Sequence, residues 1–193
     1  MYEPRHKIAV FASGYGSNFE AIARACQSGE LNAEVVLMVC DKSTARVNAL
    51  ADGMSIERLT FSAKDFPSKH DYERLIIERC KALGVELICL AGYMRLVGDT
   101  LIGAYRGRMI NLHPSLLPSF PGKDAIKQAM EYGVKVYGAT IHYVDESLDG
   151  GTIIAQQAIK YEGNSLDEVT AQIHQIEHRL YIDTIKKLLK HKE

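Results

Sequence analysis

Short apolar runs alternate with segments of helical period through the first half of the chain. Residues 86–91, ELICLA, are apolar at nearly every position, as expected of a strand covered on both faces. Between such runs, apolar residues recur every three or four positions, which is typical of amphipathic helices. This pattern predicts strands at 7–12, 34–40, 55–60, 86–91 and 108–112 and helices at 18–27, 45–52, 71–83 and 99–105.

The second half of the chain departs from this alternation. Residues 113–122, HPSLLPSFPG, hold three prolines and cannot form regular secondary structure. A helix at 123–132 then leads to two strand-like segments, 136–144 and 152–161, joined by the turn-rich DESLDGG. Ser165 and Glu168 match a capping box that opens a helix to about residue 190. The buried stripe of this last helix is predicted to be Leu166, Val169, Ile173, Ile176 and Leu180.

Strands and helices at this spacing predict an α/β fold. Parallel neighbours need crossover connections, so we expect an open, mostly parallel twisted sheet with helices on both faces. The last two strands predict an antiparallel addition near the C-terminus. With 193 residues and no linker or repeat, we expect a single domain, 1–193, with an N-terminal part of about 1–100 and a C-terminal part of about 101–193.

Composition narrows the range of partners. Lysine and arginine total 23 against 24 acidic residues, a net charge of -1, so bulk charge gives no basis for nucleic-acid binding and a small-molecule partner is favoured. No apolar run approaches the roughly 20 residues of a membrane span, and we expect a cytoplasmic protein that does not contact membranes. The four cysteines form no CxxC pair, so we expect reduced core thiols, no disulfide and no metal.

The first candidate binding loop is 13–18, SGYGSN, between the first strand and its helix. Ligands of open parallel sheets bind outside the carboxyl ends of the strands. Glycines let the backbone approach a ligand, and the free amides of a helix start suit a phosphate. The same residues are also explained by a plain helix start, because Ser17 and Glu20 match a capping box.

The same loop partly matches a dinucleotide-binding fingerprint. Gly14 and Gly16 supply two of its glycines, and Asp41 follows the second strand as a ribose-binding acid would. The third glycine is missing, because Phe19 stands in its place. A dinucleotide-binding module is therefore an alternative function.

Two later loops carry groups suited to acid–base chemistry. Strand alternation puts Asn111 and His113 on one side, and Pro114 forces the chain out of the sheet directly after the histidine. If the last two strands share that sheet, loop 145–151 ends near His113 and brings the carboxylate of Asp149 to it, favouring the charged imidazole. The alternative for His113 is a hydrogen-bonded histidine that supports its loop. The alternative for 145–151 is a solvated turn, in which acidic residues and glycines are common.

Four motifs together carry a resemblance to a known family. GSN at 16–18, AGYMRLV at 91–97, NLHPSLLPSFPG at 111–122 and LDGG at 148–151 occur in an order and at separations that resemble the glycinamide ribonucleotide formyltransferases. The resemblance runs from about residue 7 into the final helix. Methionyl-tRNA formyltransferases and formyltetrahydrofolate hydrolases look similar in part but carry a further domain, which we do not expect in 193 residues. Formyltransferases that act on amino sugar nucleotides stay open as an alternative.

The resemblance implies a reaction and its participants. The formyl group of 10-formyltetrahydrofolate, a co-substrate, would pass to the primary amine of glycinamide ribonucleotide in de novo purine biosynthesis, without a metal, in a monomer or homodimer. The N-terminal part would bind the substrate phosphate, and the C-terminal part would carry catalytic and folate-binding loops. A folate-binding protein without catalytic activity is a further possibility.

The resemblance also implies roles for individual residues. Asn111 and His113 would stabilise the oxyanion formed on attack, and Asp149 would pair with the histidine. Substrate binding is implied for Gly16, Ser17, Asn18 and Glu177, and folate binding for Lys69, Met94, Arg95, Leu96, Val97 and Asn111. Tyr15 and Lys69 depart from the family's usual small polar residue and arginine, and we expect His142 to be a structural support.

Overall fold

The structure is a computed structural model that describes residues 4–190. Its strands are hydrogen-bonded in the order β3-β2-β1-β4-β5-β6-β7. The elements, in chain order, are β1 (His6–Phe11), α1 (Ser17–Ser28), β2 (Ala33–Cys40), α2 (Arg46–Gly53), β3 (Arg58–Thr60), the 3-10 helix η1 (Ala63–Asp65), α3 (Lys69–Ala82), β4 (Leu87–Leu90), α4 (Asp99–Ala104), β5 (Met109–His113), α5 (Ala125–Tyr132), β6 (Val136–Tyr143), β7 (Ile153–Lys160) and α6 (Leu166–Lys190).

The sheet confirms the predicted fold class. β1 pairs in parallel with both β2 and β4, and β2 pairs in parallel with β3, whereas β6 and β7 are antiparallel. The chain separates into two compact units, one ending at Ile110 and the other beginning at Asn111, so the border falls within β5. The expectation of a single domain stays a prediction.

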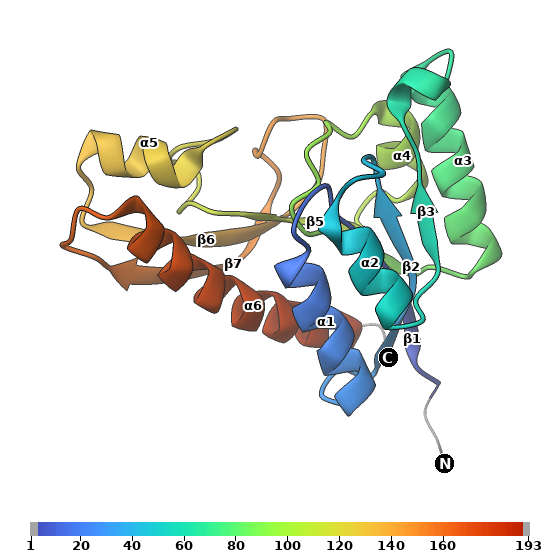
Figure 1. Cartoon of the computed structure of the whole chain (residues 1–193), viewed down its shortest axis with the longest axis horizontal. Coiled ribbons are helices and arrows are strands. Elements are labelled where there is room, and N and C mark those ends of the chain that lie inside the picture. Colours follow the sequence, from blue (N-terminus) through green and yellow to red (C-terminus); the bar gives the residue numbers. More distant parts are fainter. Residues whose placement is uncertain (1–3, 191–193) are drawn as a thin grey trace. The chain divides into compact units, whose positions relative to one another are not determined.

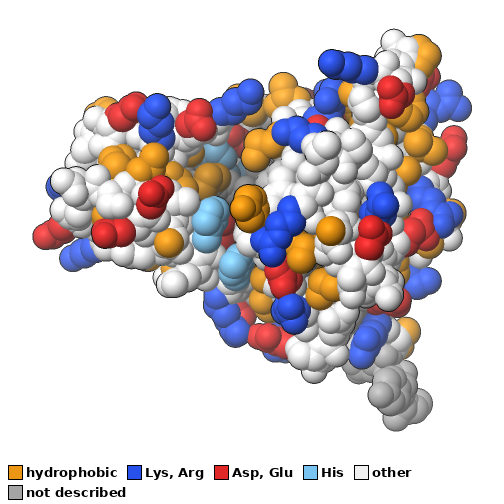
Figure 2. All heavy atoms as spheres, viewed as in Figure 1, with side chains coloured by type: hydrophobic (Ala, Val, Ile, Leu, Met, Phe, Trp, Pro, Cys, Tyr) orange, Lys and Arg blue, Asp and Glu red, His pale blue; other side chains and the backbone are white. Residues whose placement is uncertain are grey.

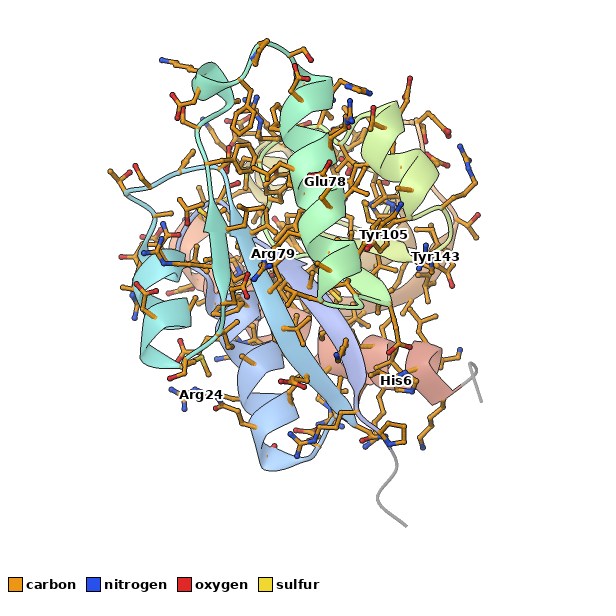
Figure 3. The ribbon with its side chains drawn as sticks, turned by 90° about the vertical axis from the view of Figure 1, so that its right-hand side faces the viewer. His6, Arg24, Glu78, Arg79, Tyr105 and Tyr143 are labelled. Carbon is orange, nitrogen blue, oxygen red and sulfur yellow. The ribbon has the colours of Figure 1, made fainter. Side chains whose placement is uncertain are left out.

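The first unit is a small parallel sheet covered on both faces. Figure 1 shows α1 and α2 on one face of β1 and β2, and α3 with α4 on the other. Figure 3, turned by 90°, shows α3 crossing the strands with α1 behind them. The strand order reverses between β1 and β4, so the loops after these two strands lie at the switch point where such sheets bind ligands.

The second unit builds its core between helices and the antiparallel pair. α6 packs along β6 and β7 and contacts α5. The buried members of this cluster are Ala129, Tyr137, Tyr161, Val169 and Ile173. Close packing also explains Gly138 in β6, where a Cβ would lie 2.2 Å from the backbone oxygen of Gln157.

Several predicted boundaries move because of local hydrogen bonds. α3 begins at Lys69 rather than residue 71, since the Ser68 hydroxyl accepts the Asp71 amide at 3.3 Å and caps the helix. The strand predicted at 55–60 shortens to β3, because Ser55 has φ 56° and closes a turn after α2. η1 was not predicted.

The start of α6 is close to prediction, and its buried stripe is confirmed in part, at Val169 and Ile173. Ser165 Oγ accepts the Glu168 amide at 3.3 Å, whereas the Glu168 carboxylate accepts the Tyr161 hydroxyl at 2.8 Å instead of closing the box. Leu166, predicted to be buried, is exposed. The stripe runs through Val169, Ile173 and Glu177, so a carboxylate occupies a buried position of the helix.

Most charged side chains lie on the surface and the cysteines lie in the core, where the composition predicts them. On the face seen in Figure 2, lysine and arginine are interspersed with aspartate and glutamate. None of the helices in residues 4–190 is both long and apolar enough to cross a lipid bilayer. The four cysteines are buried and free.

Candidate functional site

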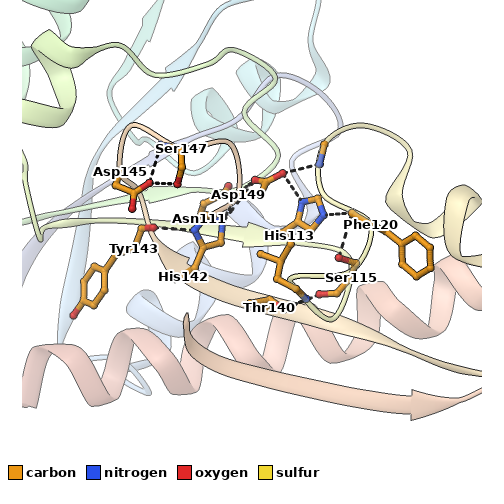
Figure 4. A network of polar contacts seen from close by, with 12 residues as sticks. Asn111, His113, Ser115, Phe120, Thr140, His142, Tyr143, Asp145, Ser147 and Asp149 are labelled. Atoms are coloured by element: carbon orange, nitrogen blue, oxygen red, sulfur yellow. Dashed lines mark hydrogen bonds and ion pairs between the residues drawn. The ribbon is translucent and has the colours of Figure 1, made fainter. Parts of the chain in front are cut away.

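His113 and Asp149 lie together in the second unit. His113 ends β5, and Asp149 belongs to the loop between β6 and β7 (Figure 4). Asp149 Oδ2 is 3.4 Å from His113 Nδ1, and the two side chains are only 11% and 5% exposed. The structure thus brings the predicted carboxylate to the predicted imidazole.

Both ring nitrogens of His113 face acceptors. Nε2 lies 2.8 Å from the carbonyl oxygen of Phe120, which can only accept, so Nε2 carries a proton. Nδ1 faces the Asp149 carboxylate. Two N–H donors satisfy this arrangement, which is the hydrogen-bonding pattern of an imidazolium.

Asn111 is oriented by His142 and Asp149. The Asn111 amide nitrogen lies 3.1 Å from His142 Nε2 and donates to Asp149 Oδ1 at 3.4 Å. His142 Nδ1 is 2.8 Å from the Tyr143 carbonyl and therefore carries the proton, which leaves Nε2 to accept from Asn111. Asp149 Oδ1 lies farther from His142 Nε2, at 3.7 Å.

Asp149 is held in an unusual backbone conformation. Its φ is 51°, in the left-handed region that aspartate and asparagine tolerate better than other side chains with a Cβ. Oδ2 also accepts the Gly122 amide at 2.8 Å. Burial by itself raises the pKa of this carboxyl, but the contacts with His142 in its protonated form, with the Gly122 amide and with His113 outweigh it and hold the pKa below its ordinary value.

The proline-rich loop after β5 is fixed from β6 and β7. The Thr140 hydroxyl accepts the Leu117 amide at 3.0 Å and donates to the Ser115 carbonyl at 2.7 Å. Gln156 donates to the Leu117 carbonyl at 2.9 Å. The sequence analysis singled out neither Ser115 nor Gln156. Gln156 is the direct cross-strand partner of Thr140 in the β6–β7 hairpin, and this pairing is the signal that could have found it.

The loop at 13–18, which ends in the GSN motif and is called the GSN loop below, opens α1 differently from its prediction. The capping box of Ser17 and Glu20 is wrong: the N-cap is Gly16, at φ 82°, with no side-chain cap. Glu20 pairs with Arg24 at 2.7 Å instead. A Cβ on Gly16 would lie 2.7 Å from Val47, so packing of α2 against this turn requires glycine here. The helix start at Gly16, Ser17 and Asn18 lies in the first unit.

The loop after β4 lines a pocket in the first unit. The pocket has a volume of about 480 Å³ and is lined by Ala63, Phe66, Pro67, Ser68, Lys69, Tyr72, Met94, Arg95 and Leu96. Met94 and Leu96 are 64% and 68% exposed, unusually high for large apolar side chains. Four of the predicted folate residues therefore share one pocket with Lys69 among them, whereas Val97 is not in its lining.

Asp41, the predicted ribose-binding acid of a dinucleotide site, makes contacts with Ser13 and Arg95 of the protein itself. Its Oδ1 accepts the Ser13 hydroxyl at 2.5 Å, and Oδ2 is 3.7 Å from Arg95 Nη1. Phe19, at the missing third glycine, is fully buried. These contacts remove the acid that a dinucleotide ribose would need.

Glu177 lies in the second unit and is buried in α6. Its carboxylate is 2.8 Å from Nδ1 of His174, one turn earlier on the helix. This hydrogen bond raises the pKa of the half-exposed His174 imidazole, against the opposing effect of desolvation. Tyr15, in the GSN loop of the first unit, is 76% exposed, with the Arg46 guanidinium 5.2 Å from its ring centre.

Among residues 4–190 there is no group of three histidine, cysteine, aspartate or glutamate side chains arranged to hold a metal ion.

Comparison with known proteins agrees with these features. The formyl transferase family model matches residues 6–185. The chain is 51% identical over 184 residues to the phosphoribosylglycinamide formyltransferase of Bacillus subtilis, covering 95% of this chain and 94% of that protein. It is 35% identical over 175 residues to the Escherichia coli enzyme of the same name, covering 90% and 82%.

A solved structure is similar throughout. Glycinamide ribonucleotide transformylase 1 from Geobacillus kaustophilus superimposes with a TM-score of 0.93 at 47% identity, covering 96% of this chain and 99% of that one. Fold, sequence and motif order thus agree over nearly the whole length, and the chain belongs to the formyl transferase family.

Proposed function

We propose that the protein transfers the formyl group of 10-formyltetrahydrofolate to the primary amine of glycinamide ribonucleotide in purine biosynthesis. The names of its relatives support the substrates. The observation that carries the chemistry is the meeting of His113, Asp149 and Asn111 at the end of β5.

The pocket of the first unit fits the folate co-substrate. Its lining combines aromatic and apolar side chains with the cations Lys69 and Arg95, which suits a molecule with an aromatic portion and an anionic glutamate tail. The Arg95 Nε is buried and has no hydrogen-bond partner in the protein, as expected of a donor meant for a ligand. Met94 and Leu96 would cover apolar portions, and Val97 would support the segment.

The helix start at Gly16, Ser17 and Asn18 is assigned to the substrate phosphate. The αL conformation of Gly16 directs the chain into α1, whose first amides have no partner within the helix. Glu177, whose buried carboxylate lies 2.8 Å from His174 Nδ1, is assigned to the glycinamide portion from the family resemblance.

Asn111 and His113 are assigned to the oxyanion. The folate supplies the formyl carbon that the amine attacks. Asn111 is anchored by His142 at 3.1 Å and His113 by the Phe120 carbonyl at 2.8 Å. The N–H groups that face Asp149, each at 3.4 Å, are assigned to donate to the developing negative charge in exchange for these longer contacts.

Asp149 is assigned two roles: it stabilises the charged form of His113, and it accepts a proton from the attacking amine. Its lowered pKa keeps it ionised near neutral pH, so it stabilises a charged His113. The attacking amine loses a proton, which the carboxylate accepts through water, and His113 donates one as the intermediate breaks down.

The test is a spectrophotometric assay of formyl transfer with the purified chain. 10-Formyltetrahydrofolate is offered with glycinamide ribonucleotide, and in parallel with an amino sugar nucleotide. We expect transfer to the former and much slower transfer to the latter. Transfer only to the sugar nucleotide, or none to either amine, contradicts the proposal. Binding of NADH, followed by its fluorescence, would revive the dinucleotide alternative.

A further inference from the structure

Asp41 is a buried acid to which the proposed function gives no role. It directly follows β2 in the first unit, and its side chain is only 5% exposed. An ionised carboxylate at such a position is costly unless donors or cations compensate it. Its two contacts, with Ser13 and Arg95, are therefore what make an acid tolerable here.

Ser13 links Asp41 to the backbone of the folate segment. Its hydroxyl donates to Asp41 Oδ1 at 2.5 Å and accepts the Met94 amide at 2.8 Å. A hydroxyl has one hydrogen, and the carboxylate can only accept, so the direction of both bonds is set. The Ser13 amide also donates to the Gly92 carbonyl at 3.0 Å, which ties the loop after β1 to the loop after β4.

Arg95 is held by its side chain in the same network. Its Nη1 lies 3.7 Å from Asp41 Oδ2, and its guanidinium carbon lies 5.3 Å from the centre of the Tyr72 ring. Met94, Arg95 and Tyr72 all line the pocket assigned to the folate. Asp41 and Ser13 thus fix the backbone of one pocket residue and the side chain of the next.

We propose that Asp41 and Ser13 are positioning residues that hold the Arg95 guanidinium ready for the glutamate carboxylate of the folate. The inference rests on the proposed function and deepens it. Both side chains are nearly fully buried, so we assign them an action through Arg95 and not on the substrate itself. Arginine binds a carboxylate through a planar fork, and restraining a long side chain beforehand reduces the entropic cost of binding.

The experiment compares two formyl donors that differ only in the tail. kcat and KM are measured for 10-formyltetrahydrofolate and for 10-formyltetrahydropteroate, which lacks the glutamate. Asp41→Asn removes the charge and keeps an acceptor for Ser13, whereas Asp41→Ala removes both. Asp52→Asn is the matched control, because Asp52 pairs with Arg58 on the surface of the same unit.

We expect both Asp41 variants to raise KM for the complete donor about tenfold, with kcat within about twofold of wild type and no change for the truncated donor. Ser13→Ala should shift KM in the same direction. Arg95→Ala should raise KM similarly, and Asp41→Ala combined with Arg95→Ala should be no worse than Arg95→Ala alone, because both changes remove one interaction. The Asp52 variant should match wild type.

Three results overturn the inference: an unchanged or lowered KM in the Asp41 variants, an equal rise for both donors, or full additivity with Arg95→Ala. If Asp41→Ala does not fold, Asp41→Asn decides the outcome. If the wild-type chain transfers no formyl group, the proposed function fails. In that case the dissociation constants of tetrahydrofolate and tetrahydropteroate are measured for the same Asp41, Arg95 and combined variants, which tests the role of Asp41 separately.

Discussion

Asp149 and His113 are distant in the sequence, yet the Asp149 Oδ2 atom lies 3.4 Å from the His113 Nδ1 atom. The contact is longer than the 2.8 Å bonds that each residue makes elsewhere, to the Gly122 amide and the Phe120 carbonyl. Each partner is thus anchored independently, and Nδ1 makes the longer of the two contacts of the His113 ring.

Replacing either residue should abolish most of the activity and leave the fold intact. Asp149→Asn keeps the size of the side chain and its tolerance of φ 51° while removing the charge. We expect this variant and His113→Ala to lower kcat by roughly 100-fold, as for loss of a group that stabilises transition-state charge. Asp167→Asn, on the exposed first turn of α6, is the control. Wild-type turnover in both site variants would end the assignment.

The GSN loop offers a matched pair of glycine substitutions. Gly16→Ala forces a Cβ into the left-handed region and to within 2.7 Å of Val47, whereas a Cβ on Gly14 meets nothing within 4 Å. We expect Gly16→Ala to destabilise the protein by about 1–3 kcal/mol and to raise KM for the phosphorylated substrate. Gly14→Ala should stay within about 0.5 kcal/mol of wild type. Denaturant unfolding and steady-state kinetics measure both, and equal behaviour of the two variants would refute the steric explanation.

The sequence predicted the architecture because strand and helix periodicity is local. The apolar runs at 7–12 and 86–91 can be recognised without knowledge of the rest of the chain. The proximity of Asp149 to His113 was also predictable, once the last two strands were taken to share a sheet with β5. Contacts set by packing were not: the αL cap at Gly16 depends on Val47, and the true partner of Asp41 is Ser13, not a ribose. Contacts between single residues far apart in the sequence produce no periodic pattern from which they could be predicted.

The pair of His174 and Glu177 should make stability depend on pH near neutrality. The pKa of His174 is raised above 6.5, chiefly by its hydrogen bond to Glu177. A raised pKa means that this contribution is complete below about 6.5 and is lost as the pH rises through the folded-state value. We expect an NMR titration to place the His174 pKa above 6.5, and Glu177→Gln to lower it. A wild-type value at or below 6.5 would contradict the contact.

The four thiols should be inert in the folded protein. Burial raises the pKa of Cys26 and of Cys80 to about 12, and it also raises the pKa of Cys40 and Cys89. Because the thiolate is the reactive form, a thiol with a pKa of 12 is ionised to only about one part in ten thousand at pH 8. An aromatic disulfide reagent should therefore react with the native protein no faster than the chain opens. In denaturant it should titrate all 4 cysteines at once. Rapid labelling of one thiol under native conditions would show that its segment opens locally, and addition of a reduced folate would then report whether ligand binding closes it.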